Sequence, residues 1–171
     1  SLATMQEVTN RLLRTLVEEH VPATGFVNEV NLFVPNQTDA RTALLEAWLN
    51  AGLDLGNHTY SHVAIDRVPF ETYKADLIKG ETVTRRLLEA RGRKLRYFRH
   101  TQLRTGPTPD YKAALDALLA ERNYRVTPVT IDNNDFVFAA VYARAKSDGD
   151  SDMVARVVEA DARIDALEAE L

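Results

Sequence analysis

The sequence contains no cysteine among its 171 residues, so disulfide bonds, thiolate metal sites and cysteine nucleophiles are excluded. It also has no run of apolar residues that approaches the length of about 18 needed by a membrane-spanning helix. The formal net charge is only −4, which argues against sequence-independent nucleic-acid binding as the main function. The content of 45% apolar and 27% charged residues is typical of a globular domain with a sizeable core.

Charge is distributed unevenly along the chain. Residues 85–104 hold eight cations against one acid, whereas residues 148–171 hold eight acids against two cations. The basic stretch has two interpretations, which both stay open. It is either an anion-binding patch or a solvated helix end that continues into a loop, where cations interact favourably with the helix dipole.

Helical and strand-like patterns alternate along the chain. Short runs of apolar and β-branched residues predict strands at residues 23–28, 53–56, 95–98 and 126–131. Apolar residues at helical spacing predict helices between Thr4 and Pro22, Thr38 and Gly52, Pro69 and Gly92, and Thr108 and Asn123. This alternation is typical of an α/β fold with a mainly parallel sheet or barrel.

Both ends of this pattern are interrupted. The chain opens on a helix with no strand before it, and its last helix continues to the final residue. We therefore expect residues 1–171 to form a single partial domain. The last helix carries an apolar stripe made of Met153, Val157, Ala160, Ile164, Leu167 and Leu171. The stripe predicts either a helix packed on the sheet or a short coiled-coil segment.

Two of the four histidines, His58 and His62, stand four residues apart directly after the second predicted strand. If the chain is helical there, the two side chains lie on one face, with about 5–6 Å between their Cβ atoms. Two neutral imidazoles can then bind one metal ion at about 2.0–2.1 Å each; the alternative is a surface pair. Thr59 occupies the place where a zincin protease helix has its glutamate base, so a base must come from another segment.

The run LGNHTYSH at residues 55–62 resembles the His-Ser/Thr-x-x-His motif of the polysaccharide deacetylases, the NodB-homology or family 4 carbohydrate esterases. Residues 23–28, 97–106 and 130–136 resemble three further segments of that family, in the same order. The resemblance implies a distorted (β/α) barrel of the NodB-homology type. This barrel is expected to be incomplete, with its first strand and its C-terminal strand or strands absent from the chain.

The resemblance also implies roles for individual residues. His58 and His62 would be two of three ligands of a divalent metal ion, usually zinc. Arg99 would orient the catalytic carboxylate and lower its pKa, and Asp135 would hold and polarise the general-acid histidine. The substrate would be contacted by His100, Asp132 and Phe136. Simpler alternatives remain for three of these residues: a surface cation at Arg99, a side chain that fills the groove wall at His100, and a turn residue at Asp132.

Departures from the family pattern limit what this stretch is expected to do. The Thr-Phe-Asp-Asp motif, with the third ligand and the general base, would lie before Ser1. The Leu-x-His motif, with the general acid, would lie after Leu171. Thr101 and Gln102 replace the usual proline and aromatic residue, beside a backbone amide that the family uses as an oxyanion donor. We therefore expect the 171-residue stretch alone to be inactive.

The expected function of the whole protein is metal-dependent removal of acetyl groups from an N-acetylated polysaccharide such as chitin or peptidoglycan, in a periplasmic or secreted location. One alternative is a non-catalytic glycan-binding relative that has the fold but not the catalytic carboxylates. Another is a helical interaction module built on the apolar stripe of the last helix. The sequence leaves the oligomeric state open.

Overall fold

A computed structural model of the chain describes residues 1–129 and 135–168, with the side chains of residues 1–129 and 136–163. The chain divides into two compact units, Ser1–Pro128 and Val129–Leu171. That residues 1–171 form one partial domain stays a prediction.

The first unit alternates strands and helices in the predicted order. Its strands are β1 (Thr24–Val27), β2 (Asp54–Asn57), β3 (Tyr97–Phe98) and β4 (Arg125–Val126). Its α-helices are α1 (Leu2–Glu18), α2 (Thr38–Asn50), α3 (Phe70–Lys79), α4 (Thr82–Glu89) and α5 (Pro109–Glu121). Three short 3-10 helices follow the first three strands: η1 (Glu29–Leu32), η2 (Ile65–Arg67) and η3 (Thr101–Leu103).

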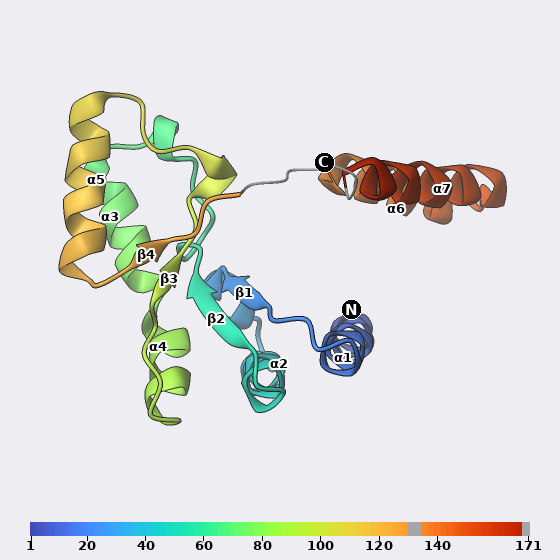
Figure 1. The fold of residues 1–171 in the computed structure, drawn as a ribbon, viewed down its shortest axis with the longest axis horizontal. Helices are drawn as coiled ribbons and strands as arrows, with labels where there is room; N and C mark the ends of the chain where they lie inside the picture. The colour runs from blue at the N-terminus through green and yellow to red at the C-terminus, as the bar shows by residue number, and fades with distance from the viewer. Residues whose placement is uncertain (130–134, 169–171) are drawn as a thin grey trace. The chain divides into compact units, whose positions relative to one another are not determined.

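The four strands form one parallel sheet in the order β1-β2-β3-β4 (Figure 1). Val27 pairs with Asn57, and Asn57 pairs with Phe98, so the carboxyl ends of the first three strands lie at one edge of the sheet. The loops that carry chemistry in α/β folds leave from this edge. The α/β class with a parallel sheet is thereby confirmed, although four strands in this linear order do not show a closed barrel.

The core lies between the sheet and the helices that cover it. Leu55 of β2 and Phe98 of β3 are almost completely buried, as are Tyr73 and Leu77 of α3 and Leu115 of α5. Helices α3 and α5 pack side by side over this core (Figure 1). Each such side chain contributes about 1.5–3 kcal/mol through burial, so this cluster fixes the sheet that carries the histidine motif.

The helix predicted between Pro69 and Gly92 is in fact two helices, α3 and α4, separated at Gly80. The second helix has its own buried cap. Glu29 is fully buried, and its carboxylate accepts hydrogen bonds from the amides of Val83 (3.0 Å) and Thr84 (2.7 Å) in the first turn of α4. A carboxylate in that position pairs amides that have no partner within the helix, which stabilises a new helix start.

The last predicted strand is shorter than expected. The sequence predicted residues 126–131, but β4 covers only Arg125–Val126, and residues 127–129 are irregular. Pro128 lacks the N–H that a further ladder bond needs, which accounts for the end of the strand. The remaining residues of the predicted strand, 130 and 131, lie outside the described residues.

The second unit consists of two helices, α6 (Asp135–Asp148) and α7 (Ser151–Glu168), which pack against each other. Gly149 adopts a positive φ of 73° in the short turn between them. Val157, a member of the apolar stripe, is buried in this unit together with Ala145. Packing of the stripe on the sheet stays a prediction. None of the helices in the described part of the chain has the length and hydropathy needed to cross a bilayer.

Candidate active site

His58 and His62 lie at the carboxyl end of β2, in a loop and not in a helix. Thr59 and His62 both have a positive φ, of 65° and 59°, which is incompatible with the helical geometry considered for this segment. The loop nevertheless brings the two imidazoles together. Their ring centroids are 4.8 Å apart, with an angle of 64° between the ring planes.

The Nδ1 atom of each ring contacts a residue in the loop after β3. Nδ1 of His58 lies 2.9 Å from the carbonyl oxygen of Arg99, and Nδ1 of His62 lies 3.2 Å from Nε2 of Gln102. Because a carbonyl only accepts, His58 must donate from Nδ1, which leaves the lone pair of its Nε2 for a ligand. Metal-binding histidines commonly donate their other ring N–H to an acceptor, as His58 does here. The contact at His62 has the opposite sense, because the side-chain amide of Gln102 donates to its Nδ1.

The protonation state of His58 is also suitable for a residue that binds a metal ion. Burial lowers the pKa of His58 below its ordinary value of 6.5, while the hydrogen bond to Arg99 acts in the opposite direction. Electrostatic interactions with His62 and Arg99 lower this pKa further. The ring is therefore neutral near pH 7, and only a neutral imidazole binds a metal ion.

Hydrogen bonds to polar side chains fix the backbone of the histidine loop. The Thr59 hydroxyl accepts from the amide of His62 (3.1 Å), and the Asn57 side-chain oxygen accepts from the amide of Thr59 (2.7 Å). The side-chain amide of Asn28 donates to the carbonyl oxygen of His58 at 2.5 Å. These bonds stabilise the unusual backbone between the two histidines, since each compensates for part of the strain of a positive φ.

Gly80 lies directly against this loop. A Cβ atom at position 80 would stand 2.4 Å from the carbonyl carbon of Thr59 and 2.4 Å from the nitrogen of Tyr60. The Tyr60 amide donates to the carbonyl oxygen of Asp76, and the Ser61 hydroxyl donates to the Asp76 carboxylate. Glycine is therefore required between α3 and α4 because the backbone of the histidine loop occupies the space of a side chain.

A buried polar cluster stands behind the loop. The side-chain nitrogen Nδ2 of Asn57 donates to the carbonyl oxygen of Leu77 (3.0 Å) and to the hydroxyl of Tyr124 (2.9 Å). Burial raises the pKa of Tyr124, so its hydroxyl keeps its proton and donates to the carboxylate of Glu81 at 2.5 Å. Glu81 is also paired with Arg122. The amide of Asn57 thus has a defined orientation, with both of its N–H groups and its oxygen in use.

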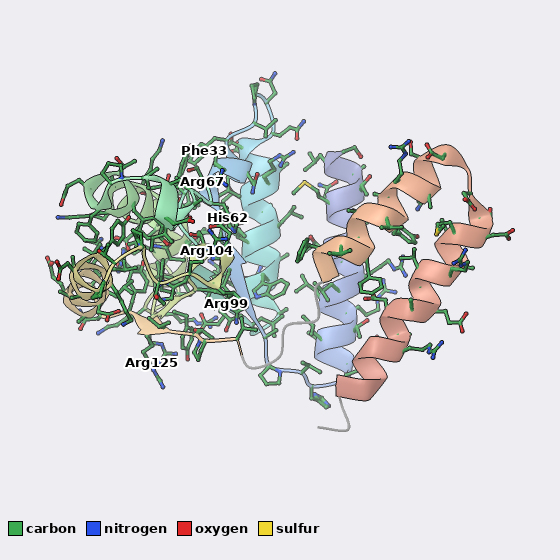
Figure 2. The ribbon with its side chains drawn as sticks, turned by 90° about the horizontal axis from the view of Figure 1, so that it is seen from above. Phe33, His62, Arg67, Arg99, Arg104 and Arg125 are labelled. Carbon is green, nitrogen blue, oxygen red and sulfur yellow. The ribbon has the colours of Figure 1, made fainter. Side chains whose placement is uncertain are left out.

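Arg99 lies beside His58, because its carbonyl oxygen contacts Nδ1 of that histidine; Figure 2 labels Arg99 and His62. Its guanidinium carbon is 4.3 Å from the centre of the Phe26 ring, and its Nε is buried without a hydrogen-bond partner among the described residues. The structure therefore brings Arg99 together with the pair, while its action on a catalytic carboxylate stays a prediction.

The other predicted site residues are placed differently. His100 is 9% exposed and packs edge-on against Phe98, at 5.3 Å between ring centroids, so most of its surface faces the protein and not solvent. Asp132 lies outside the described residues. Asp135 is the first residue of α6, and the adjacent Phe136 is 68% exposed; both belong to the second unit. The roles expected for these four residues stay predictions.

Half of the eight cations in the basic stretch form ion pairs with described residues. Arg85 pairs with Glu81, Arg93 and Arg96 both approach Asp54, and Arg104 pairs with Asp66. These contacts favour the interpretation as a solvated helix end and loop over an anion-binding patch.

The donor set fits part of a metal site. Two imidazoles whose ring centroids lie 4.8 Å apart are suitable ligands for one zinc ion. Among the side chains of residues 1–129 and 136–163, no group of three or more from histidine, cysteine, aspartate and glutamate is arranged to hold a metal ion. The described residues therefore supply two of the three protein ligands that a catalytic zinc usually has.

Sequence reasoning missed the residues that support the histidine loop: Asn28, Asn57, Gly80 and Glu81. A usable signal was present for three of them. Asn28 and Asn57 both stand at the carboxyl end of a predicted strand, where side chains of an α/β fold converge. The isolated glycine within a helical pattern was a further signal of close packing.

The sequence profile of the polysaccharide deacetylase family matches residues 3–126, so the chain belongs to this family. No curated protein shows significant similarity to the chain.

Solved structures share the fold. A pseudoenzyme of carbohydrate esterase family 4 from Bacillus anthracis has 18% identity and a TM-score of 0.57, over 82% of this chain and 46% of that chain. A peptidoglycan deacetylase from Bacillus subtilis has 18% identity and a TM-score of 0.56, over 81% and 61%. The chitin deacetylase from the fungal pathogen Colletotrichum lindemuthianum has 23% identity and a TM-score of 0.59, over 75% and 53%. The chain thus spans less than two thirds of the length of each of these structures.

Proposed function

We propose that this chain is part of a metal-dependent hydrolase that removes acetyl groups from an N-acetylated polysaccharide, with His58 and His62 as two metal ligands. The observation that carries this proposal is the pair of imidazoles, 4.8 Å apart at the carboxyl edge of the sheet, each contacted at Nδ1 by the loop after β3. Membership of the polysaccharide deacetylase family supports the reaction class. Zinc is favoured because imidazole ligands suit it well.

A divalent ion at this pair would supply Lewis acidity for the acetyl carbonyl and a bound water with a pKa near 7. The chain's own residues bind and orient. His58 and His62 would present ring nitrogens to the ion, and the Arg99 guanidinium would favour the ionised form of a neighbouring carboxylate. The family resemblance implies that a backbone amide beside Gln102 would donate to the oxyanion that forms on the acetyl carbon; one such donor is typically worth about 10²–10³ in rate.

We assign no described residue as the general base, the general acid or the third metal ligand. The family resemblance assigns them to motifs before Ser1 and after Leu171. We therefore propose that the 171-residue chain binds metal without turning over substrate. The chitin-like or peptidoglycan-like nature of the substrate and the extracellular location remain part of this proposal.

A non-catalytic glycan-binding protein is the second candidate. It is favoured by one of the similar structures, which is itself a pseudoenzyme of carbohydrate esterase family 4. The two candidates differ in one measurable respect, since both bind glycan but only the hydrolase releases acetate.

The metal site is tested by titrating the metal-free chain with zinc. We expect the His58→Ala, His62→Ala double variant to lose the tightest binding, whereas His20→Asn, which removes a histidine at the end of α1, keeps it. Unchanged zinc binding in the double variant would show that these residues are not ligands. Acetate release from chitin oligomers and peptidoglycan by the longest natural form of the protein then distinguishes hydrolase from binding protein.

A further inference from the structure

An aromatic surface continues from the histidine loop onto the neighbouring segment. Phe33, at the end of η1, is 50% exposed, and its ring lies 6.1 Å from the ring of Tyr60, with 37° between the planes. Tyr60 stands between the two histidines in sequence. The amide of Val30 donates to the carbonyl oxygen of Tyr60 at 3.0 Å, so η1 is tied to the histidine loop. Figure 2 labels both Phe33 and His62 in the first unit.

Beyond Phe33 lies a cavity between α2 and α4, most of whose lining residues have polar or charged side chains. It has a volume of about 520 Å³, and it is lined by Phe33, Thr38, Asp39, Thr42, Glu46, Thr82, Val83 and Arg86. This lining combines hydroxyls, carboxylates and one guanidinium with a single exposed aromatic ring. Glu46 is partly buried, and neither Glu46 nor Arg86 forms an ion pair within the described part of the chain.

This lining differs from that of an ordinary apolar pocket. A sugar ring presents an apolar C–H face, which stacks on an aromatic side chain, and a rim of hydroxyl groups that both donate and accept. Carboxylates such as Asp39 and Glu46 accept from those hydroxyls, and Arg86 donates to hydroxyl and acetamido oxygens. A neutral ligand with many hydroxyl groups therefore matches this cavity. Its hydroxyls can donate to the carboxylates and accept from the guanidinium, and the ligand itself needs no charge.

We propose that the cavity between α2 and α4, with Phe33 at its border, is a subsite for the sugar units of an N-acetylated oligosaccharide chain. This inference rests on the proposed function, since the same chain would extend from the histidine pair past Tyr60 and Phe33. Phe33 stacks on one sugar ring, and Glu46 and Arg86 bind the hydroxyl and acetamido groups of the next. The subsite makes binding depend on the length of the oligosaccharide.

Binding of the N-acetylglucosamine tetramer and of the monomer to the 171-residue chain tests the subsite. We expect Phe33→Ala to weaken tetramer binding by roughly two- to tenfold, the range that loss of one aromatic stacking contact gives, and to leave the weak binding of the monomer nearly unchanged. Phe33→Tyr keeps the flat ring and retains the affinity, whereas Phe33→Leu keeps apolar area only and does not. Glu46→Gln weakens tetramer binding as well.

A matched control is Val17→Ala, which truncates a side chain of similar exposure (48%) on α1 and leaves binding unchanged. Amide chemical shifts on tetramer addition locate the contact. Changes at Phe33, Thr42 and Glu46 support the subsite. Changes confined to the histidine loop, or equal affinities of Phe33→Ala and the unmodified chain, overturn the subsite and leave the proposed function standing. No binding of either sugar at any residue overturns both.

Discussion

Replacement of Gly80 by alanine is the sharpest test of how the histidine loop is held. The backbone at Gly80 has φ −75° and ψ 5°, so alanine is conformationally allowed there. Helix propensity alone predicts that alanine stabilises the protein by up to about 1 kcal/mol. The close approach to Thr59 predicts the opposite, so the sign of the change decides between the two effects.

The size of the effect follows from the contact distances. Ordinary contacts of a Cβ begin near 3.4 Å, whereas the new methyl would lie 2.4 Å from backbone atoms of Thr59 and Tyr60, so about 1.0 Å of displacement is needed. The obstacle is backbone and not the end of a flexible side chain. Overpacking of this kind costs about 1–3 kcal/mol, and we expect a net loss of about 1–2 kcal/mol in the free energy of unfolding.

Urea unfolding measures this loss, and a zinc titration of the folded chain measures its effect on the site. We expect zinc affinity to fall at least about tenfold, as for other changes that displace the surroundings of a metal ligand. Ala51→Gly is a matched control, because Ala51 ends α2 with nearly the same backbone, φ −74° and ψ 2°. A Gly80→Ala variant that is as stable as the unmodified chain, with unchanged zinc affinity, would refute this reasoning.

Three further substitutions test the buried polar groups by urea unfolding. Glu29→Gln places an amide N–H₂ or a weaker acceptor against two helix amides, and we expect a loss of about 1–3 kcal/mol; a loss below about 0.5 kcal/mol contradicts the capping role. Tyr124→Phe removes the hydroxyl between Glu81 and Asn57 and is expected to cost about 1–3 kcal/mol, so a neutral effect contradicts the cluster. Burial lowers the pKa of His100 below 6.5, so the unfolded chain takes up the proton more readily and stability falls as the pH drops below about 6.5. His100→Leu should make this fall smaller, and an equal fall in both proteins contradicts the assignment.

The helices and strands of the first unit could be predicted from the sequence because local signals specify where they begin and end. Thr108 caps α5 by accepting from the amide of Tyr111, as the Thr-Pro pair predicted, and Asn123 has the positive φ of 58° expected of a helix stop. The order of short strands and helices then implies parallel pairing, since each strand is followed by a crossover. Contacts between residues close in sequence account for this success.

The break at Gly80 could not be predicted in the same way. Apolar positions on both sides, such as Leu77 and Val83, fit one helical period, and the penalty of a lone glycine is small. What divides the helix is the backbone of Thr59, about twenty residues earlier in the chain, together with the carboxylate of Glu29. Such contacts are set by the tertiary fold and leave no periodic signal.

For the histidine pair, the sequence motif predicted correctly that the two side chains meet, but the helix considered for this segment was wrong. A helix would bring His58 and His62 together through their spacing of four. The loop instead brings them together through two residues of positive φ, Thr59 and His62 itself. A spacing argument therefore identifies which side chains can meet, while the backbone that makes them meet depends on partners elsewhere, such as Asn28 and Asn57.

Burying the polar residues that support the histidine loop costs free energy, which their hydrogen bonds must offset. Asn57 is fully buried and Glu81 is 4% exposed, and burying an amide or a carboxylate is unfavourable unless every polar atom is paired. An apolar replacement of such a network is often neutral or stabilising, so stability alone is a weak reason for its presence. The network does what apolar side chains cannot: its directed hydrogen bonds fix a strained loop in one conformation. The strained and supported loop holds the two imidazoles, which is where a metal site needs rigidity most.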